Sequence, residues 1–224
     1  MIEAEWWDYE DEGEWAEAVA GDIGFIVESA VEARGEALIA LPGGAALAPV
    51  FALLAAAKLT IVPTDDLLVP LSDERSSVRA IAQALLATGA RVFPITGDIA
   101  DAKLAGNSAN AKLGELKFPL DLAWLAVGAE GNAAGMVDSP DLDEALNAPK
   151  GRHAVGLTPA DGGTARITLT RSAILSARTV LLTVAGDEAK ALVEGAIADG
   201  QSSKLPIGRV LAEVDQPIDI HWVA

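Results

Sequence analysis

The sequence predicts a single α/β domain over residues 1–224, with a mostly parallel, twisted sheet that carries helices on both faces in a Rossmann-like arrangement. Two observations lead to this fold class. Short apolar runs, typical of buried strands, alternate with segments of helical periodicity. At this spacing, such alternation is typical of parallel sheets. A length of 224 residues suits one large domain or two small ones, and no linker, internal repeat or low-complexity tract divides the chain.

The elements of the first half follow from periodicity and from turn residues. Apolar residues at helical spacing predict a helix over residues 14–33. The apolar run Ala37–Leu41 stops at Pro42-Gly43-Gly44, which is typical of a buried strand that enters a tight turn. The elements expected next are a helix over residues 45–57, a strand over 59–62, a helix from a Ser76 cap to about residue 86, a strand over 91–93 and a helix over 99–113.

In the second half, Leu120–Val127 is the clearest strand of the chain, and it ends at Gly128. A loop rich in Gly, Asp and Pro follows it. The remaining expected elements are strands near residues 154–155, over 167–169 and over 179–184, a helix over 187–198 and a final strand over 218–223.

The composition excludes several functional classes. There are 33 acidic and 16 basic residues, so a formal net charge of −17 should repel nucleic acids and anionic membranes. The chain has no Cys, and its two His, His153 and His221, lie far apart, so we expect neither disulfides nor a metal site.

No targeting or spanning segment is expected either. Eleven acidic residues precede the first basic one, Arg34, which is the opposite of a secretory signal. The longest apolar run, residues 45–57, is too short to span a bilayer. These features predict a cytoplasmic protein. No Walker lysine and no dinucleotide fingerprint is present, and no cofactor is expected.

Three loops after expected strands are candidates for a site, because ligands of open α/β sheets bind at the carboxyl ends of the strands. Gly43 and Gly44 precede a helix whose N–H groups could bind an anion, although a Gly-Gly turn without a ligand is more common. Asp65 could orient a base or bind hydroxyl groups, although the segment alone favours a solvated turn. The loop at residues 128–132 suits a substrate loop and an ordinary turn equally well.

These loops, in this order, resemble those of 6-phosphogluconolactonase, in the larger group that includes glucosamine-6-phosphate deaminase and ribose-5-phosphate isomerase. The family loop Ser-Gly-Gly-Ser-Thr-Pro aligns with residues 42–47, and Asp-Glu-Arg-x-Val-Pro-x-x-Asp-x-x-Ser-Asn aligns with residues 65–77. Gly-x-Asp-Gly-His-x-Ala-Ser-Leu-Phe aligns with residues 128–137, and Arg-Ile-Thr-Leu-Thr is identical at residues 166–170. The resemblance covers nearly the whole chain.

The resemblance implies an enzyme that hydrolyses a sugar lactone, phosphorylated in the family, in the pentose phosphate or Entner–Doudoroff route. Its small-molecule partner would be a sugar phosphate or a sugar lactone. The implied catalytic positions are Asp65 and Asn132. The implied positions for binding substrate or phosphate are Gly43, Gly44, Arg166 and Lys190, and Arg75 is added as a hypothesis.

The departures from the family pattern fall at chemically important positions. The family base, a His, is Asn132 here, and a carboxamide cannot remove a proton from water although it can orient it. The substrate-contacting Arg of the family is Leu67, and the hydroxyls of the phosphate loop are replaced by Ala45 and Ala46. Lys190 stands one place away from the family lysine.

Three functional hypotheses follow. The protein is a weakened lactonase, a non-catalytic protein that binds a sugar phosphate or a protein partner, or a hydrolase for a less anionic substrate. Arg75 either replaces the lost charge or is a surface cation near Asp73. His153 could replace the lost base only if it faces the Asn132 loop, and His221 is expected to be structural or exposed.

Overall fold

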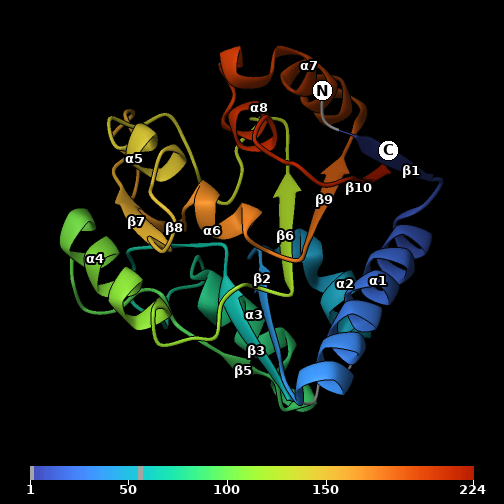
Figure 1. Ribbon diagram of the computed structural model, residues 1–224, viewed down its shortest axis with the longest axis horizontal. Helices are drawn as coiled ribbons and strands as arrows, with labels where there is room; N and C mark the ends of the chain where they lie inside the picture. The colour runs from blue at the N-terminus through green and yellow to red at the C-terminus, as the bar shows by residue number, and fades with distance from the viewer. Residues whose placement is uncertain (1–2, 55–57) are drawn as a thin grey trace.

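The computed structural model describes residues 3–54 and 58–224 (Figure 1). At its centre lies a seven-stranded sheet in which all paired strands are parallel. The strand order is β1 (Ala4–Tyr9), β10 (Ile218–Val223), β9 (Thr179–Ala185), β6 (Leu122–Val127), β2 (Ala37–Leu41), β3 (Leu59–Pro63) and β5 (Arg91–Val92). The predicted α/β class with a mostly parallel sheet is confirmed.

The strand order reverses between β2 and β6. From β2 the chain proceeds outward through β3 to β5, and from β6 it proceeds in the other direction through β9 to β10. Such a reversal leaves a crevice outside the carboxyl ends of the two central strands, and this is where open α/β sheets bind ligands. The turns after β2 and β6 therefore face the expected position of a site.

A second, three-stranded antiparallel sheet contains β4 (Asp65–Leu67), β8 (Arg166–Leu169) and β7 (Ala154–Leu157), in that order. The sequence predicts β7 and β8 as strands but not β4. β4 was not predicted because it begins with two adjacent aspartates, and an Asp-Asp pair is typical of a turn. In the register of the small sheet, Asp65 lies opposite Thr168, and Leu67 lies opposite Arg166.

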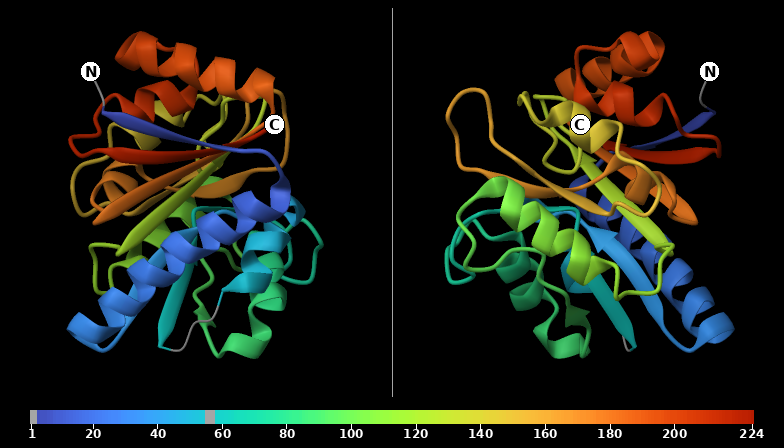
Figure 2. Two further views of the ribbon diagram at one scale, coloured as in Figure 1. Left: turned by 90° about the vertical axis from the view of Figure 1, so that its right-hand side faces the viewer. Right: turned by 60° about the vertical axis from the view of Figure 1, so that its left-hand side comes forward.

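Helices cover both faces of the large sheet, as predicted. The first face carries α1 (Glu12–Arg34), α2 (Ala48–Leu53) and α3 (Ser77–Ala84), and α1 runs obliquely across it (Figure 2, left). The second face carries the small sheet together with α4 (Ala102–Leu113), α5 (Leu142–Leu146), α6 (Arg171–Leu175), α7 (Asp187–Asp199) and α8 (Pro206–Leu211). No helix in the described part of the chain combines the length and the apolar character that crossing a bilayer requires.

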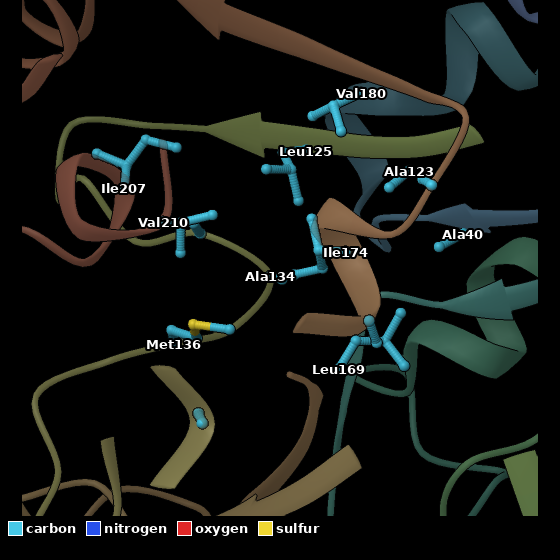
Figure 3. Packing of buried hydrophobic residues seen from close by; sticks show 14 of the residues in the cluster. Ala40, Ala123, Leu125, Ala134, Met136, Leu169, Ile174, Val180, Ile207 and Val210 are labelled. Carbon is cyan, nitrogen blue, oxygen red and sulfur yellow. The ribbon is translucent and has the colours of Figure 1, made fainter. Parts of the chain in front are cut away.

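Buried side chains of β6 alternate between two cores, which explains its continuous apolar sequence. Leu122 and Trp124 pack on the α1 side, whereas Ala123 and Leu125 pack on the other side, among residues of α6 and α8 (Figure 3). Trp124 donates its indole N–H to Thr183 Oγ1 at 2.9 Å. Burial of each Leu or Ile side chain contributes about 1.5–3 kcal/mol to the free energy of folding. The two cores therefore stabilise the packing of both layers on the sheet.

Capping residues set the helix boundaries. Asp11 accepts a hydrogen bond from the Glu14 N–H at the start of α1, and Ser76 accepts one from the Arg79 N–H at the start of α3. Asp101 caps α4 in the same way, so this helix begins at Ala102 rather than at residue 99 as predicted. Loss of the cap would expose N–H groups that have no partner within the helix.

The helix predicted over residues 45–57 is much shorter in the structure. A single 3-10 turn, η1 (Ala45–Leu47), leads into the six residues of α2, and Leu54 is already extended. Pro49 lies in the first turn of α2, where its missing N–H costs least. The rest of the predicted helix, residues 55–57, lies outside the described residues.

Candidate active site

A cleft of about 300 Å³ lies at the point where the strand order reverses. We call it the switch-point cleft. Its walls come from the turns after β2, β3 and β6, from β4 and from β8. Its lining residues are Pro42, Gly43, Thr64, Asp65, Ala126, Gly128, Ala129, Glu130, Asn132, Ala134, Gly135 and Arg166. Four of the seven predicted site residues, Gly43, Asp65, Asn132 and Arg166, therefore line the same cleft, and Gly44 follows Gly43 in the chain.

Asp65 and Arg166 form the charged centre of the cleft. Arg166 Nη1 lies 3.6 Å from Asp65 Oδ2, and the two side chains are 22% and 19% exposed. The Thr64 hydroxyl donates to Asp65 Oδ1 at 3.4 Å. The short antiparallel pairing of β4 with β8 brings the two residues together across 101 positions of sequence. The solvated turn that the segment alone favours is not what forms.

Burial raises the pKa of the Asp65 carboxyl to about 6, because a carboxylate loses hydration there. The positive charge of Arg166 lowers this pKa, and the negative charge of Asp66 raises it. Asp66 itself is buried and accepts hydrogen bonds from the Ser77 N–H at 2.7 Å and from Thr96 Oγ1 at 2.9 Å. Asp66 thus fixes the start of α3, whereas Asp65 is free to face the cleft.

Gly135 also lines the cleft, although the sequence motifs did not point to it. Its φ is +68°, and a Cβ at this position would lie 2.6 Å from Asp65 Cβ. A side chain here would therefore displace the Asp65 carboxyl. The aligned family block has Ser at this position, and this difference was the one signal in the sequence that could have drawn attention to Gly135.

The loop after β6 is anchored on the opposite side by α8. The Ile207 N–H donates to the Gly131 carbonyl at 3.2 Å, and the Met136 N–H donates to the Ala133 carbonyl at 2.8 Å. Within the loop, Asn132 Nδ2 donates to Glu130 Oε2 at 2.9 Å. This bond leaves the Asn132 carbonyl oxygen as an acceptor at the cleft.

Gly43 permits the turn after β2 to pack against α3. A Cβ on Gly43 would lie 2.8 Å from Ser77 Cα, so only glycine fits. Gly44 has a φ of +135°, which also favours glycine. The turn leads into short helical segments rather than into the long helix that was expected, so the helix dipole near Gly44 is smaller than predicted.

Comparison with known proteins shows which family the chain belongs to. The family model described as "Glucosamine-6-phosphate isomerases/6-phosphogluconolactonase" matches residues 10–222. The chain belongs to this family. A 6-phosphogluconolactonase of Mesorhizobium japonicum is 30% identical, with 97% of this chain and 94% of the relative covered. One of Rhizobium meliloti is also 30% identical, with 96% of each chain covered. The crystal structure of a 6-phosphogluconolactonase from Shewanella baltica matches with a TM-score of 0.91 at 25% identity, covering 99% of this chain and 98% of that one.

Two cations among the predicted site residues, Lys190 and Arg75, do not line the cleft. Lys190 Nζ donates to Asp8 at 2.9 Å and lies 3.9 Å from the centre of the Trp222 ring. This position depends on β1, a strand that the sequence did not predict. A phosphate-binding role for Lys190 stays a prediction that the geometry does not favour, because Lys190 does not line the cleft.

Arg75 is an exposed cation bound to its neighbour. Its Nε and Nη2 donate to the two oxygens of Asp73 at 3.0 and 2.9 Å. Of the two alternatives for Arg75, the structure therefore shows the surface cation next to Asp73. The hypothesis that Arg75 replaces the positive charge lost at position 67 is not supported, because its guanidinium is already bonded to Asp73 at the surface.

Neither histidine faces the Asn132 loop. His153 stacks on Phe118, with ring centroids 3.8 Å apart, and lines a different cavity. His221 is buried in β10, between Tyr9 and Asp22. Burial lowers the pKa of both imidazoles. Within residues 3–54 and 58–224, no three acidic or histidine side chains are grouped so that they could hold a metal ion.

Proposed function

We propose that the protein hydrolyses the ring ester of a sugar lactone, with Asp65 as the general base. The observation that carries the proposal is a largely buried carboxyl, next to Arg166 in the switch-point cleft, whose pKa is raised to about 6. A base is most effective when its pKa lies near the working pH, because it is then both largely ionised and able to hold a proton. Strongly shifted carboxyls in clefts are candidates for catalysis.

In this mechanism the Asp65 carboxylate accepts a proton from a water molecule as the water oxygen attacks the lactone carbonyl carbon. The carbonyl oxygen becomes negatively charged, and the guanidinium of Arg166 stabilises that charge. The tetrahedral intermediate then collapses, the bond between the carbonyl carbon and the ring oxygen breaks, and the proton held by Asp65 passes to the leaving oxygen. The product is the open hydroxy acid.

Asn132 supports this reaction without taking part in proton transfer. Its amide is held by Glu130, and its carbonyl oxygen can accept a hydrogen bond from the attacking water. Because the aligned family position is a histidine, we propose that Asp65 has taken over proton removal in this chain. Activity is then expected to be altered or lower than in the relatives.

The proposal is tested by following acid release from freshly prepared glucono-δ-lactone and 6-phosphoglucono-δ-lactone. The wild-type protein is expected to exceed the spontaneous rate on at least one of them. Asp65→Asn should lower that catalysed rate by about 10²–10⁴-fold, because the carboxamide keeps the shape of the side chain but cannot accept the proton.

The matched control is Asp98→Asn, which makes the same chemical change at an exposed position away from the cleft. This variant should keep the wild-type rate. If wild-type protein, Asp65→Asn and Asp98→Asn all match the buffer rate, the proposed activity is wrong. In that case calorimetry with 6-phosphogluconate distinguishes a non-catalytic sugar-phosphate-binding protein from one that binds no such ligand.

A further inference from the structure

A second cavity, of about 240 Å³, opens beside the switch-point cleft. We call it the side pocket. Gly43, Ala126 and Gly128 line both cavities, so the two spaces adjoin. The other walls of the side pocket come from the start of α1, from η1 and from the carboxyl ends of β6, β9 and β10. The side pocket therefore neighbours the position that we propose for the lactone ring.

The walls of the side pocket are largely apolar. Trp15, Leu47, Val127, Val184 and Val223 all line it and are themselves buried. Glu12 is the single charged residue among the described residues that line it, and no Lys, Arg or His takes part. Apolar walls with few polar groups are typical of pockets that bind uncharged groups.

The charges around both cavities disfavour a second anion. Three carboxylates line the two cavities, those of Glu12, Asp65 and Glu130, against one cation, Arg166. Arg166 already lies next to Asp65, so its charge is partly compensated. The volume of the side pocket would admit a phosphate as well as a short alkyl group. Charge, rather than size, is therefore what discriminates between substrates here.

One donor in the wall has no partner. The indole N–H of Trp15 is buried and finds no acceptor among residues 3–54 and 58–224. A buried donor without a partner is unfavourable, and an oxygen atom of a ligand, charged or uncharged, could satisfy it after a small adjustment of the ring, so this donor does not discriminate between the lactones.

We propose that the side pocket holds an uncharged, largely apolar substituent, so that the preferred substrate is a neutral lactone rather than a phosphorylated one. This inference rests on the proposed lactonase function, since it takes the cleft to be the position of the lactone ring. Two ring carbons are bonded to the ring oxygen, the carbonyl carbon and the δ carbon. The inference assigns the side pocket to the group on the δ carbon.

Three six-membered lactones with different groups on this ring carbon provide the test: δ-octalactone, which has a propyl group and no ring hydroxyls, and the pair glucono-δ-lactone and 6-phosphoglucono-δ-lactone, which share their ring hydroxyls and differ only in the phosphate. We expect kcat/KM for δ-octalactone or glucono-δ-lactone to exceed that for the phosphorylated lactone at least tenfold. A kcat/KM that is highest for the phosphorylated lactone would overturn the inference.

A charge placed in the pocket should reverse the preference. Ala46 lines the side pocket and is exposed, so Ala46→Lys adds a cation there without disturbing the core. The ratio of kcat/KM for the phosphorylated lactone to that for δ-octalactone should rise about tenfold or more. Ala48→Lys is the matched control, because Ala48 is exposed nearby but does not line the pocket. Equal ratios in Ala46→Lys and Ala48→Lys would contradict the assignment.

Calorimetry with the corresponding δ-lactams separates this inference from the proposed function, because lactams resist hydrolysis. Tighter binding of the neutral lactams without turnover of any lactone would refute the lactonase function, and it would keep only the assignment of the side pocket to an uncharged substituent. Turnover with a preference for the phosphorylated substrate would keep the function and refute the inference. If no lactam binds, the inference is wrong.

Discussion

Arg166 and Asp66 act on the Asp65 carboxyl in opposite directions. The guanidinium stabilises the ionised form, and the neighbouring carboxylate destabilises it, while burial is the largest influence and raises the pKa. The resulting pKa of about 6 places the ionisation of Asp65 within the range in which enzymes are usually assayed. The protonation state of this single residue should therefore control the rate.

The catalysed rate should rise with pH through about 6, because only the ionised carboxylate can accept a proton from water. Arg166→Gln removes the charge that lowers the Asp65 pKa, so the midpoint of this rise should move to higher pH. The measurement is kcat/KM for glucono-δ-lactone between pH 4.5 and 8.5, with the spontaneous rate subtracted at each pH. A midpoint that moves to lower pH in Arg166→Gln would show that Asp65 is not the titrating base.

At the level of residues, the family resemblance singled out Asp65, Asn132 and Arg166 as candidates but did not predict how Asp65 and Arg166 lie relative to each other. The Asp65–Arg166 contact depends on the pairing of β4 with β8, and β4 is a three-residue strand with two aspartates. Neither periodicity nor local turn chemistry predicts such a pairing, because it forms between segments 101 positions apart. The pKa of Asp65 was unpredictable for the same reason.

At the level of elements, the loop after β6 controls where the Asp65 side chain can lie. Its conformation places Gly135 against β4 at a positive φ, and α8 fixes the loop through Gly131. The position of the Asp65 carboxyl thus depends on three elements that are far apart in the sequence. This arrangement makes Gly135 a positioning residue.

Gly135→Ala should lower kcat for lactone hydrolysis about tenfold or more, because the added Cβ would lie 2.6 Å from Asp65 Cβ and must displace it. The left-handed φ adds a cost of about 1–2 kcal/mol in the folded state. The measurements are kcat, its pH profile and urea unfolding. Gly195→Ala is the control: this glycine lies in α7 with open space around it, so the change should leave kcat unchanged. Wild-type kcat and an unmoved pH profile in Gly135→Ala would contradict the role of Gly135.

The strands that were predicted correctly are those with continuous apolar sequences, such as β2, β6 and β9, because both of their faces are buried. β1 was missed because it is an edge strand in which the acidic residues Glu5 and Asp8 are exposed, and because the strand it pairs with in the described part of the chain is the distant β10. The missed strand also bears on Lys190, which the family resemblance suggested for binding phosphate. Its partner Asp8 lies on β1 and holds it away from the cleft.

At the scale of the whole molecule, the buried charge of Asp65 should cost stability. The folded state holds the Asp65 proton up to about pH 6, whereas the unfolded state releases it near pH 3.8. As pH rises between these values, the folded state binds more protons than the unfolded state, and the free energy of unfolding decreases. Below pH 3.8 the two states bind this proton equally, and the cost disappears.

Asp65→Asn should therefore be more stable than the wild type by about 1–3 kcal/mol at pH 8, and this gain should shrink towards zero near pH 4. Urea unfolding at the two pH values measures the difference. Asp98→Asn, an exposed control, should change the free energy of unfolding little at either pH. Asp65→Asn that is less stable than the wild type at pH 8 would show that the Arg166 contact outweighs the cost of burial.

The net charge of −17 should also govern which lactones reach the site. A phosphorylated lactone is repelled by the molecule as a whole and by the carboxylates around the two cavities, and salt screens this repulsion. Its kcat/KM should therefore rise several-fold between about 0.02 and 0.5 M NaCl, whereas kcat/KM for glucono-δ-lactone should stay nearly constant because the substrate carries no charge. The neutral lactone is the internal control for effects of salt on the enzyme itself. A kcat/KM for the phosphorylated lactone that falls with salt would instead reveal net attraction, and it would place a cation in its path that the lining of the two cavities does not provide.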